Sequence, residues 1–254
     1  MSTYRLAGVH VPRIGLGTNR LTTAPEHVAF VREAVAAGVR HIDTAHLYSA
    51  GASERAIGAA LEGVTTGDVL VATKGGYRAG EGRPAVLGEQ IEQSLRSLQT
   101  DAIGLYYLHR VDPQTPLEES LGAIKDYVDR GAIRHIGLSD VSVAQIERGR
   151  EVVPIAAVQN RYSVGAREHD DVVDHCEREG IAFVPYFPLR GAGGPGLAAA
   201  SERLGVSENT VKLAWLLQRS PVMLPIPGTL SLEHLRENLA ALEIELDDPG
   251  AIAT

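Results

Sequence analysis

The chain has 254 residues, of which 44% are hydrophobic and 22% charged, and its formal net charge is −8. This length and composition suit one domain of barrel size with a well-packed core. The acidic balance argues against a nucleic-acid partner, because no basic excess is available to neutralise phosphates. Cys176 is the only cysteine, which excludes intrachain disulfides and cysteine-based zinc sites.

The N-terminus lacks the apolar segment of a signal peptide, and no run of about 18 apolar residues occurs. We therefore expect a cytoplasmic protein with no membrane contact. Among the 24 basic residues only Lys74, Lys125 and Lys212 are lysines, so an ordinary surface cation is an arginine in this chain. A lysine at a special place is correspondingly more informative.

Short apolar runs alternate with amphipathic segments along the whole chain. Residues 4–11, with Gly8 at the centre, predict a small β-hairpin, and residues 13–18 (RIGLGT) predict a strand that ends in glycines. Further strands are predicted at 39–42, 69–73, 103–108, 133–138, 155–158, 181–185 and 222–224. Helical spacing is seen near 26–37, 53–63, 87–98, 117–130, 142–150, 169–179, 207–219 and 231–242.

This alternation predicts parallel strand pairing with helical crossovers. Counted from RIGLGT, it gives eight strand–helix units in about the length of a (β/α)8 barrel. We therefore predict an α/β fold in which a single (β/α)8 TIM barrel, preceded by a short N-terminal β-hairpin, forms one domain over residues 1–254. The alternative is an open doubly wound sheet, but the first predicted turn (IGLGTNRL) does not match the glycine pattern of its dinucleotide site.

Polar side chains follow the predicted strands with a regular placement. The active site of such a barrel lies at the C-terminal ends of the strands. The residues found there are Asp43 with Tyr48, Lys74, His109, Ser139 with Asp140, Gln159 with Asn160, Tyr186, and the segment 226–229. Their repeated position after successive strands indicates an enzyme.

Tyr48, Lys74 and Asp43 form a coherent proton-donating unit. A phenol has a pKa of about 10, a nearby ammonium lowers that pKa, and a carboxylate holds the ammonium in place. His109 is then suited to orient a substrate oxygen. Simpler readings exist, since a strand-end lysine can be a solvated cation and a histidine after an apolar strand is often a packed one. The segment HIDTAH lacks a third metal ligand at suitable spacing, so we predict no metal site.

Taken together, the motifs resemble the aldo-keto reductase family in order over nearly the whole chain. They are GVRHIDTAHLY, VATKGG, LYYLHRVDPQTP, IRHIGLSD, VQNRYS and IPGT with LRENL. The resemblance implies an NAD(P)H-dependent oxidoreductase on a (β/α)8 barrel that reduces an aldehyde or ketone to an alcohol. It further implies Tyr48 as the general acid, Lys74 and Asp43 as the groups that tune it, and His109 as the group that positions the carbonyl.

The same resemblance implies a set of cofactor-binding residues. Asp43 and Asp140 belong to it. Ser139 and Gln159 would hold the nicotinamide carboxamide, and Tyr186 would stack on the ring. Gly17, Thr18 and Asn19 would line the cofactor from the first strand. Phe187, Leu189 and Gly191 would follow the pyrophosphate, and the adenosine end would lie among Ile226, Gly228, Thr229, His234, Glu237 and Asn238.

Two positions depart from the family pattern. The family usually has Asn where this chain has Asp140, and a carboxylate cannot donate a hydrogen bond as an amide does. Lys and Arg often pair with the 2′-phosphate of NADP at positions that are Gly228 and His234 here, which leaves Thr229, Ser231 and Arg236 as candidate partners. NADPH is the expected cofactor, with NADH as the alternative.

Two other functions compete with reduction of a small carbonyl substrate. A barrel aldolase or lyase would use Lys74 as a Schiff base. A non-catalytic nicotinamide-binding regulatory subunit would keep the cofactor without turning it over. The sequence specifies no oligomeric state.

Overall fold

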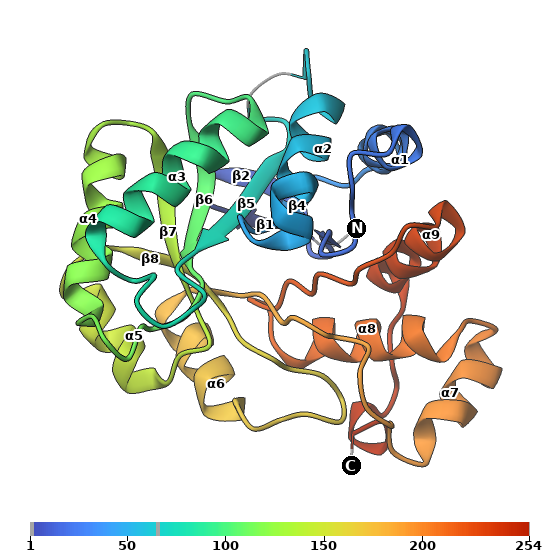
Figure 1. Cartoon of the computed structure of the whole chain (residues 1–254). Helices are drawn as coiled ribbons and strands as arrows, with labels where there is room; N and C mark the ends of the chain where they lie inside the picture. Colours follow the sequence, from blue (N-terminus) through green and yellow to red (C-terminus); the bar gives the residue numbers. More distant parts are fainter. Residues whose placement is uncertain (1–2, 65–66, 254) are drawn as a thin grey trace.

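A computed structural model describes residues 3–64 and 67–253 (Figure 1). Parallel strands form one curved sheet in which each strand pairs with the next along the chain. They are β3 (Leu16–Gly17), β4 (His41–Asp43), β5 (Leu70–Gly75), β6 (Ile103–Leu108), β7 (Ile133–Ser139), β8 (Ile155–Gln159) and β9 (Ala182–Phe183). The predicted α/β barrel architecture is confirmed.

The ring of strands closes through residues 222–228, where the sequence predicts an eighth strand. Gly15 N donates to Pro225 O at 3.0 Å and Gly17 N to Pro227 O at 3.2 Å. On the other side, this segment is bridged to β9 through Met223. The prediction of a regular strand at 222–224 is wrong, because closely spaced prolines (221, 225 and 227) offer carbonyl acceptors but lack the N–H donors of a ladder.

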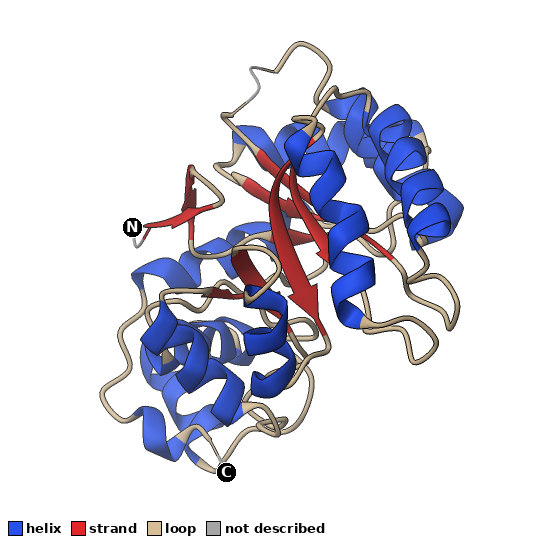
Figure 2. Ribbon diagram, turned by 90° about the vertical axis from the view of Figure 1, so that its left-hand side faces the viewer, coloured by secondary structure: helices blue, strands red, loops and turns tan. Residues whose placement is uncertain are grey.

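Helices surround the strands on the outer face of the barrel (Figure 2). They are α1 (Pro25–Ala36), α2 (Ala52–Ala60), α3 (Pro84–Leu98), α4 (Leu117–Asp129), α5 (Val143–Arg150), α6 (Asp170–Glu179), α7 (Gly196–Leu204), α8 (Glu208–Arg219) and α9 (Leu232–Ala240). Ser142 and Ser207 cap α5 and α8 by accepting from Gln145 N and Thr210 N, as typical N-cap residues do. None of the described helices combines the length and apolarity that a membrane span requires.

Helix α7 is not among the predicted helices. Its sequence, GLAAASERL, buries only Leu197 and Ala200, because a short alanine-rich helix beside a neighbour carries a weak apolar stripe. It lies next to α8 (Figure 1). The loop before it is held by the C-terminal segment, since Gly194 N donates to Ile252 O at 2.7 Å.

The N-terminal hairpin is confirmed and closes one end of the barrel. Strands β1 (Thr3–Leu6) and β2 (Val9–Pro12) are antiparallel, and they bury Leu6 and Val11 completely. These two side chains share a core cluster with the inward-facing residues of the barrel: Leu70, Ala72, Leu105, Tyr107, Ala157, Ala182, Val184, Leu224 and Ile226. Access to the interior is therefore from the opposite, C-terminal end.

Strand periodicity places the predicted catalytic groups at that open end. Side chains two residues apart lie on the same face of a strand. Because Leu70 and Ala72 face the barrel interior, Lys74 also points inward, above them. By the same spacing His109 follows Leu105 and Tyr107.

Candidate active site

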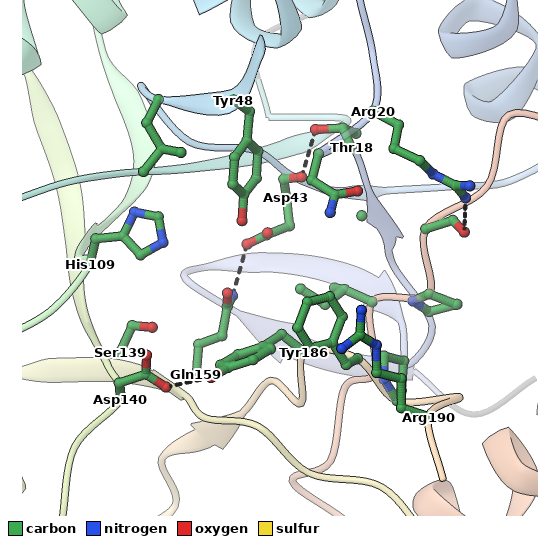
Figure 3. Close-up of a pocket in the computed structure, with 18 of the residues that line it drawn as sticks. Thr18, Arg20, Asp43, Tyr48, His109, Ser139, Asp140, Gln159, Tyr186 and Arg190 are labelled. Carbon is green, nitrogen blue, oxygen red and sulfur yellow. Dashed lines mark hydrogen bonds between the residues drawn. The ribbon is translucent and has the colours of Figure 1, made fainter. Parts of the chain in front are cut away.

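A cleft of about 530 Å³ lies at the C-terminal ends of the strands (Figure 3). Most of the residues predicted to bind cofactor or substrate line it. These are Gly17, Thr18, Asn19, Asp43, Tyr48, His109, Ser139, Asp140, Gln159, Tyr186, Phe187, Leu189, Ile226 and Gly228. Lys74 does not reach the cleft surface and lies fully buried beneath it.

Lys74 and Asp43 form a buried ion pair at the floor of the cleft. Lys74 Nζ lies 2.6 Å from Asp43 Oδ1 and donates to Thr44 O at 2.7 Å. Burial alone would lower the pKa of Lys74, but the negative charge of Asp43 and its hydrogen bond to the ammonium outweigh burial, so that the pKa is raised. Lys74 is therefore a charged ammonium in this site.

Tyr48 lies beside this ammonium, with Lys74 Nζ 5.2 Å from the centre of its ring. Its hydroxyl points into the space between His109 and Asp43 (Figure 3). The sequence predicts a lowered pKa for the phenol, but in the structure burial outweighs the effect of Lys74 and raises the pKa of Tyr48 above 10.0. Tyr48 consequently carries its proton at neutral pH.

A strained turn presents Tyr48 to the cleft. The short helical turn η1 (Tyr48–Gly51) has left-handed φ values at three successive residues, 48° at Ser49, 52° at Ala50 and 78° at Gly51. Such conformations are costly for non-glycine residues and occur often at functional sites. The fold maintains this strain directly after the proposed proton donor.

His109 stands next to Tyr48 in an edge-to-face arrangement, with ring centres 6.2 Å apart. Burial lowers the pKa of His109 to about 2, and the positive charges of Lys74 and Arg110 act in the same direction. The imidazole is thus neutral at every ordinary pH. A neutral imidazole has one N–H donor, which suits a hydrogen bond to a carbonyl oxygen.

Gln159, Ser139 and Tyr186 form a second group on the opposite wall. Gln159 Nε2 donates to Asp43 Oδ2 at 2.8 Å, which leaves its carbonyl oxygen as an acceptor. Among the described residues, the Ser139 hydroxyl makes no hydrogen bond. An acceptor, a free hydroxyl and the flat ring of Tyr186 fit a nicotinamide with its carboxamide.

Asp140 stands where the family usually has Asn, and its contacts differ from those that an amide could make. It accepts a hydrogen bond from the Tyr186 hydroxyl at 2.7 Å and lies 3.3 Å from Arg110 Nε. Both contacts leave the carboxylate as an acceptor, in keeping with its chemistry. Asp140 therefore holds the ring of Tyr186 in place rather than offering a donor to the cleft.

Two arginines face each other across the other end of the cleft, Arg20 above and Arg190 below in Figure 3. Arg20 Nη2 donates to Gly228 O at 3.0 Å. Position 17 has no room for a side chain, because a Cβ on Gly17 would lie 2.6 Å from Ile226 O. Two guanidinium groups beside a glycine-lined wall fit a diphosphate.

Comparison with known proteins agrees with this geometry. The sequence pattern described as "Aldo/keto reductase family" matches residues 13–199 and 196–250. The chain belongs to the aldo/keto reductase family. It is accordingly an oxidoreductase, and the resemblance read from its motifs is confirmed.

Several members of the family are similar over nearly their whole length. Pyridoxine 4-dehydrogenase of Escherichia coli is 36% identical, with 97% of this chain and 95% of that protein aligned. A thermostable aldo-keto reductase solved with the inhibitor epalrestat has a TM-score of 0.88 at 30% identity, covering 98% of this chain and 96% of that one. An aldo-keto reductase of Klebsiella pneumoniae solved with NADP and acetate has a TM-score of 0.85 at 28% identity, covering 97% and 91%.

Some residues that the family resemblance places at the cofactor lie outside the described cleft. The lining ends at Gly228 and excludes Gly191, Thr229, His234, Glu237 and Asn238. Gly191 O instead accepts from Lys212 Nζ at 3.0 Å, and Asn238 is buried on α9. Their contacts with an adenosine remain predictions.

Other lining residues were missed in the sequence. They are Arg20, Leu47, Tyr77, Arg110, Pro188 and Arg190. The arginines were passed over because arginine is the ordinary surface cation of this chain. The available signal was position, since Arg110 directly follows His109 at the end of a strand.

The buried histidines of this aldo-keto reductase make a testable prediction about acid stability. His41 is fully buried, neither ring nitrogen has a hydrogen-bond partner among the described residues, and burial lowers its pKa to about 4. Asp43 opposes this shift and Lys74 adds to it. An exposed histidine has a pKa of about 6.5. Below that pH the unfolded chain binds protons at His41 and His109 that the folded chain excludes, so the free energy of unfolding falls as the pH falls.

From pH 7 to pH 5, each histidine should remove about 2 kcal/mol from the free energy of unfolding. Urea unfolding at both pH values measures this loss. In the His41→Asn variant, the loss of unfolding free energy between pH 7 and pH 5 should be smaller by about 2 kcal/mol, the contribution of one histidine. An unchanged difference would contradict the buried, uncharged state of His41.

Proposed function

We propose that this chain reduces an aldehyde or ketone to an alcohol with NADPH, and that Tyr48 donates the proton. The observation that carries the proposal is the convergence of Tyr48, Lys74, Asp43 and His109 at the open end of the barrel. Membership of the aldo/keto reductase family supports it. The NADP complex of the Klebsiella pneumoniae relative supports the choice of cofactor.

NADPH, when bound, supplies the hydride. Gln159 and Ser139 would hold its carboxamide, and Tyr186 would support one face of the ring. Arg20 and Arg190 would neutralise the diphosphate. Each of these side chains lines the same cleft.

The chain's own residues complete the reaction at the carbonyl oxygen. As a C–H bond forms at the carbonyl carbon, the π electron pair moves onto the oxygen, and Tyr48 transfers its hydroxyl proton there. The Lys74 ammonium stabilises the resulting phenolate, and Asp43 keeps that ammonium in position. The neutral His109 donates a hydrogen bond to the same oxygen, where negative charge develops. Solvent then returns a proton to Tyr48.

The aldolase alternative fits the site less well. A Schiff base requires an unprotonated amine that a substrate can reach. Lys74 Nζ is fully buried, is held by Asp43 and Thr44 O, and has a raised pKa. Lys74 thus acts as a fixed charge. The regulatory-subunit alternative gains no support either, because all four catalytic positions are filled.

The similarity to pyridoxine 4-dehydrogenase gives a specific substrate candidate. If it extends to the reaction, the substrate is the aldehyde pyridoxal in one direction and pyridoxine in the other. Pyridoxal therefore belongs in any substrate panel for this chain.

A reductase assay over a panel of carbonyl compounds that includes pyridoxal tests the proposal. NADPH and NADH are each supplied in turn, and loss of reduced cofactor is followed together with alcohol formation. We expect turnover with NADPH and a lower kcat/KM with NADH. Cofactor binding without turnover of any compound, or borohydride trapping of a substrate on Lys74, would refute carbonyl reduction.

A further inference from the structure

The wall beyond His109 carries an aromatic ring and a cation that the proposed reaction does not use. Tyr77 follows β5, and its ring centre lies 4.9 Å from that of His109. Arg110 follows β6, and its guanidinium carbon lies 4.4 Å from the centre of the Tyr77 ring. Both line the cleft, next to the group that would orient the carbonyl.

Arg110 keeps most of its hydrogen-bonding capacity. Its Nε lies 3.3 Å from Asp140 Oδ2, and half of its side chain is exposed. The two terminal nitrogens make no hydrogen bond among the described residues. Because a guanidinium has five N–H donors in a planar fork, the contact at Nε leaves the outer face of the fork free for an anion. Stacking on Tyr77 fixes the plane of that fork.

The charges around this wall favour an anionic ligand although the chain as a whole carries −8. The carboxylates that line the cleft are Asp43 and Asp140, and each already faces a cation, Lys74 or Arg110. The cations Arg20 and Arg190 lie at the diphosphate end. Glu81, which accepts from the Tyr77 N–H at 3.1 Å, is paired with Arg78. An anion beside Tyr77 therefore meets no unpaired carboxylate.

We propose that the substrate class of this site is flat aromatic aldehydes that carry an anionic oxygen. The aldehyde lies at Tyr48 and His109, the ring lies against Tyr77, and the anionic group binds the fork of Arg110. The inference rests on the proposed carbonyl reduction and adds the recognition of the far end of the substrate. It makes Arg110 a specificity-determining residue.

Two aldehydes of similar shape, one anionic and one neutral, test this inference. They are para-carboxybenzaldehyde and its neutral methyl ester, each assayed with NADPH. A single charge-assisted hydrogen bond should give the carboxylate about a tenfold higher kcat/KM, mainly through KM. Arg110→Met should abolish the preference, so that the ratio of the two kcat/KM values falls from about ten to about one, and Arg110→Lys should retain part of it because the charge remains without the fork.

Arg148→Met is the matched control, since Arg148 is a half-exposed arginine that pairs with Glu118, and neither residue lines the cleft. It should leave the preference unchanged. The preference should also weaken as salt is raised, because the pair is partly exposed. Equal use of both aldehydes by the parent protein, or an undiminished preference in Arg110→Met, would overturn the role of Arg110. If neither these aldehydes nor any other carbonyl compound is reduced, the result refutes the proposed carbonyl reduction, and with it the inference about Arg110.

Discussion

Tyr48→Phe is expected to lower kcat for carbonyl reduction by roughly 10² to 10⁴-fold, the usual contribution of a general acid. The substitution removes one oxygen atom and keeps the ring that packs against His109. NADPH binding should stay close to normal, because the groups proposed to hold the cofactor are untouched. Steady-state kinetics and a titration of cofactor binding measure the two effects separately.

Tyr127→Phe provides the control for this experiment. Tyr127 lies on α4, and its hydroxyl donates to Gly88 O at 3.2 Å, away from the cleft. Loss of that hydroxyl should leave kcat unchanged. Full activity in Tyr48→Phe would remove Tyr48 from the proton-transfer step.

Lys74→Met is the second change with a large expected effect. It removes the ammonium that stabilises the phenolate, so the pKa of Tyr48 rises further and kcat should fall by roughly 10² to 10⁴-fold. It also leaves Asp43 buried without a counter-charge. Breaking a buried pair in this way costs about 3 to 5 kcal/mol, which urea unfolding would detect.

The double variant Asp43→Asn with Lys74→Met separates folding from chemistry. Removing both charges should restore much of the lost stability, since no uncompensated carboxylate remains. It should not restore kcat, because the phenolate still lacks its neighbouring cation. Recovery of activity along with stability would show that Lys74 acts only through the fold.

The convergence of the four proposed catalytic groups could be predicted because it depends on local regularities. Two-residue periodicity sets which side chains of β5 and β6 face inward, and parallel strands end at the same edge. Lys74 and His109 were therefore placed correctly without any knowledge of their contacts. Ser142 and Ser207 likewise predicted the starts of two helices, because a serine at the N-cap accepts from a backbone N–H of the first turn.

Other features depend on tertiary context. The direction of the Tyr48 pKa was predicted incorrectly, because the cost of burial depends on how the whole cleft packs around the phenol. The eighth strand is irregular because its prolines lack donors, although its carbonyls still close the ring. Arg110 was missed because its contacts with Tyr77 and Asp140 form only in the fold, although its position directly after His109 was a usable signal.

Transfer of deuterium from NADPH labelled at the nicotinamide C4 tests the central claim most directly. The alcohol product is isolated and its former carbonyl carbon is examined by NMR spectroscopy. We predict that each alcohol formed carries one deuterium at that carbon and that product formation nearly ceases in Tyr48→Phe. An alcohol without deuterium at that carbon, or unchanged product formation in the variant, would contradict hydride transfer coupled to proton donation by Tyr48.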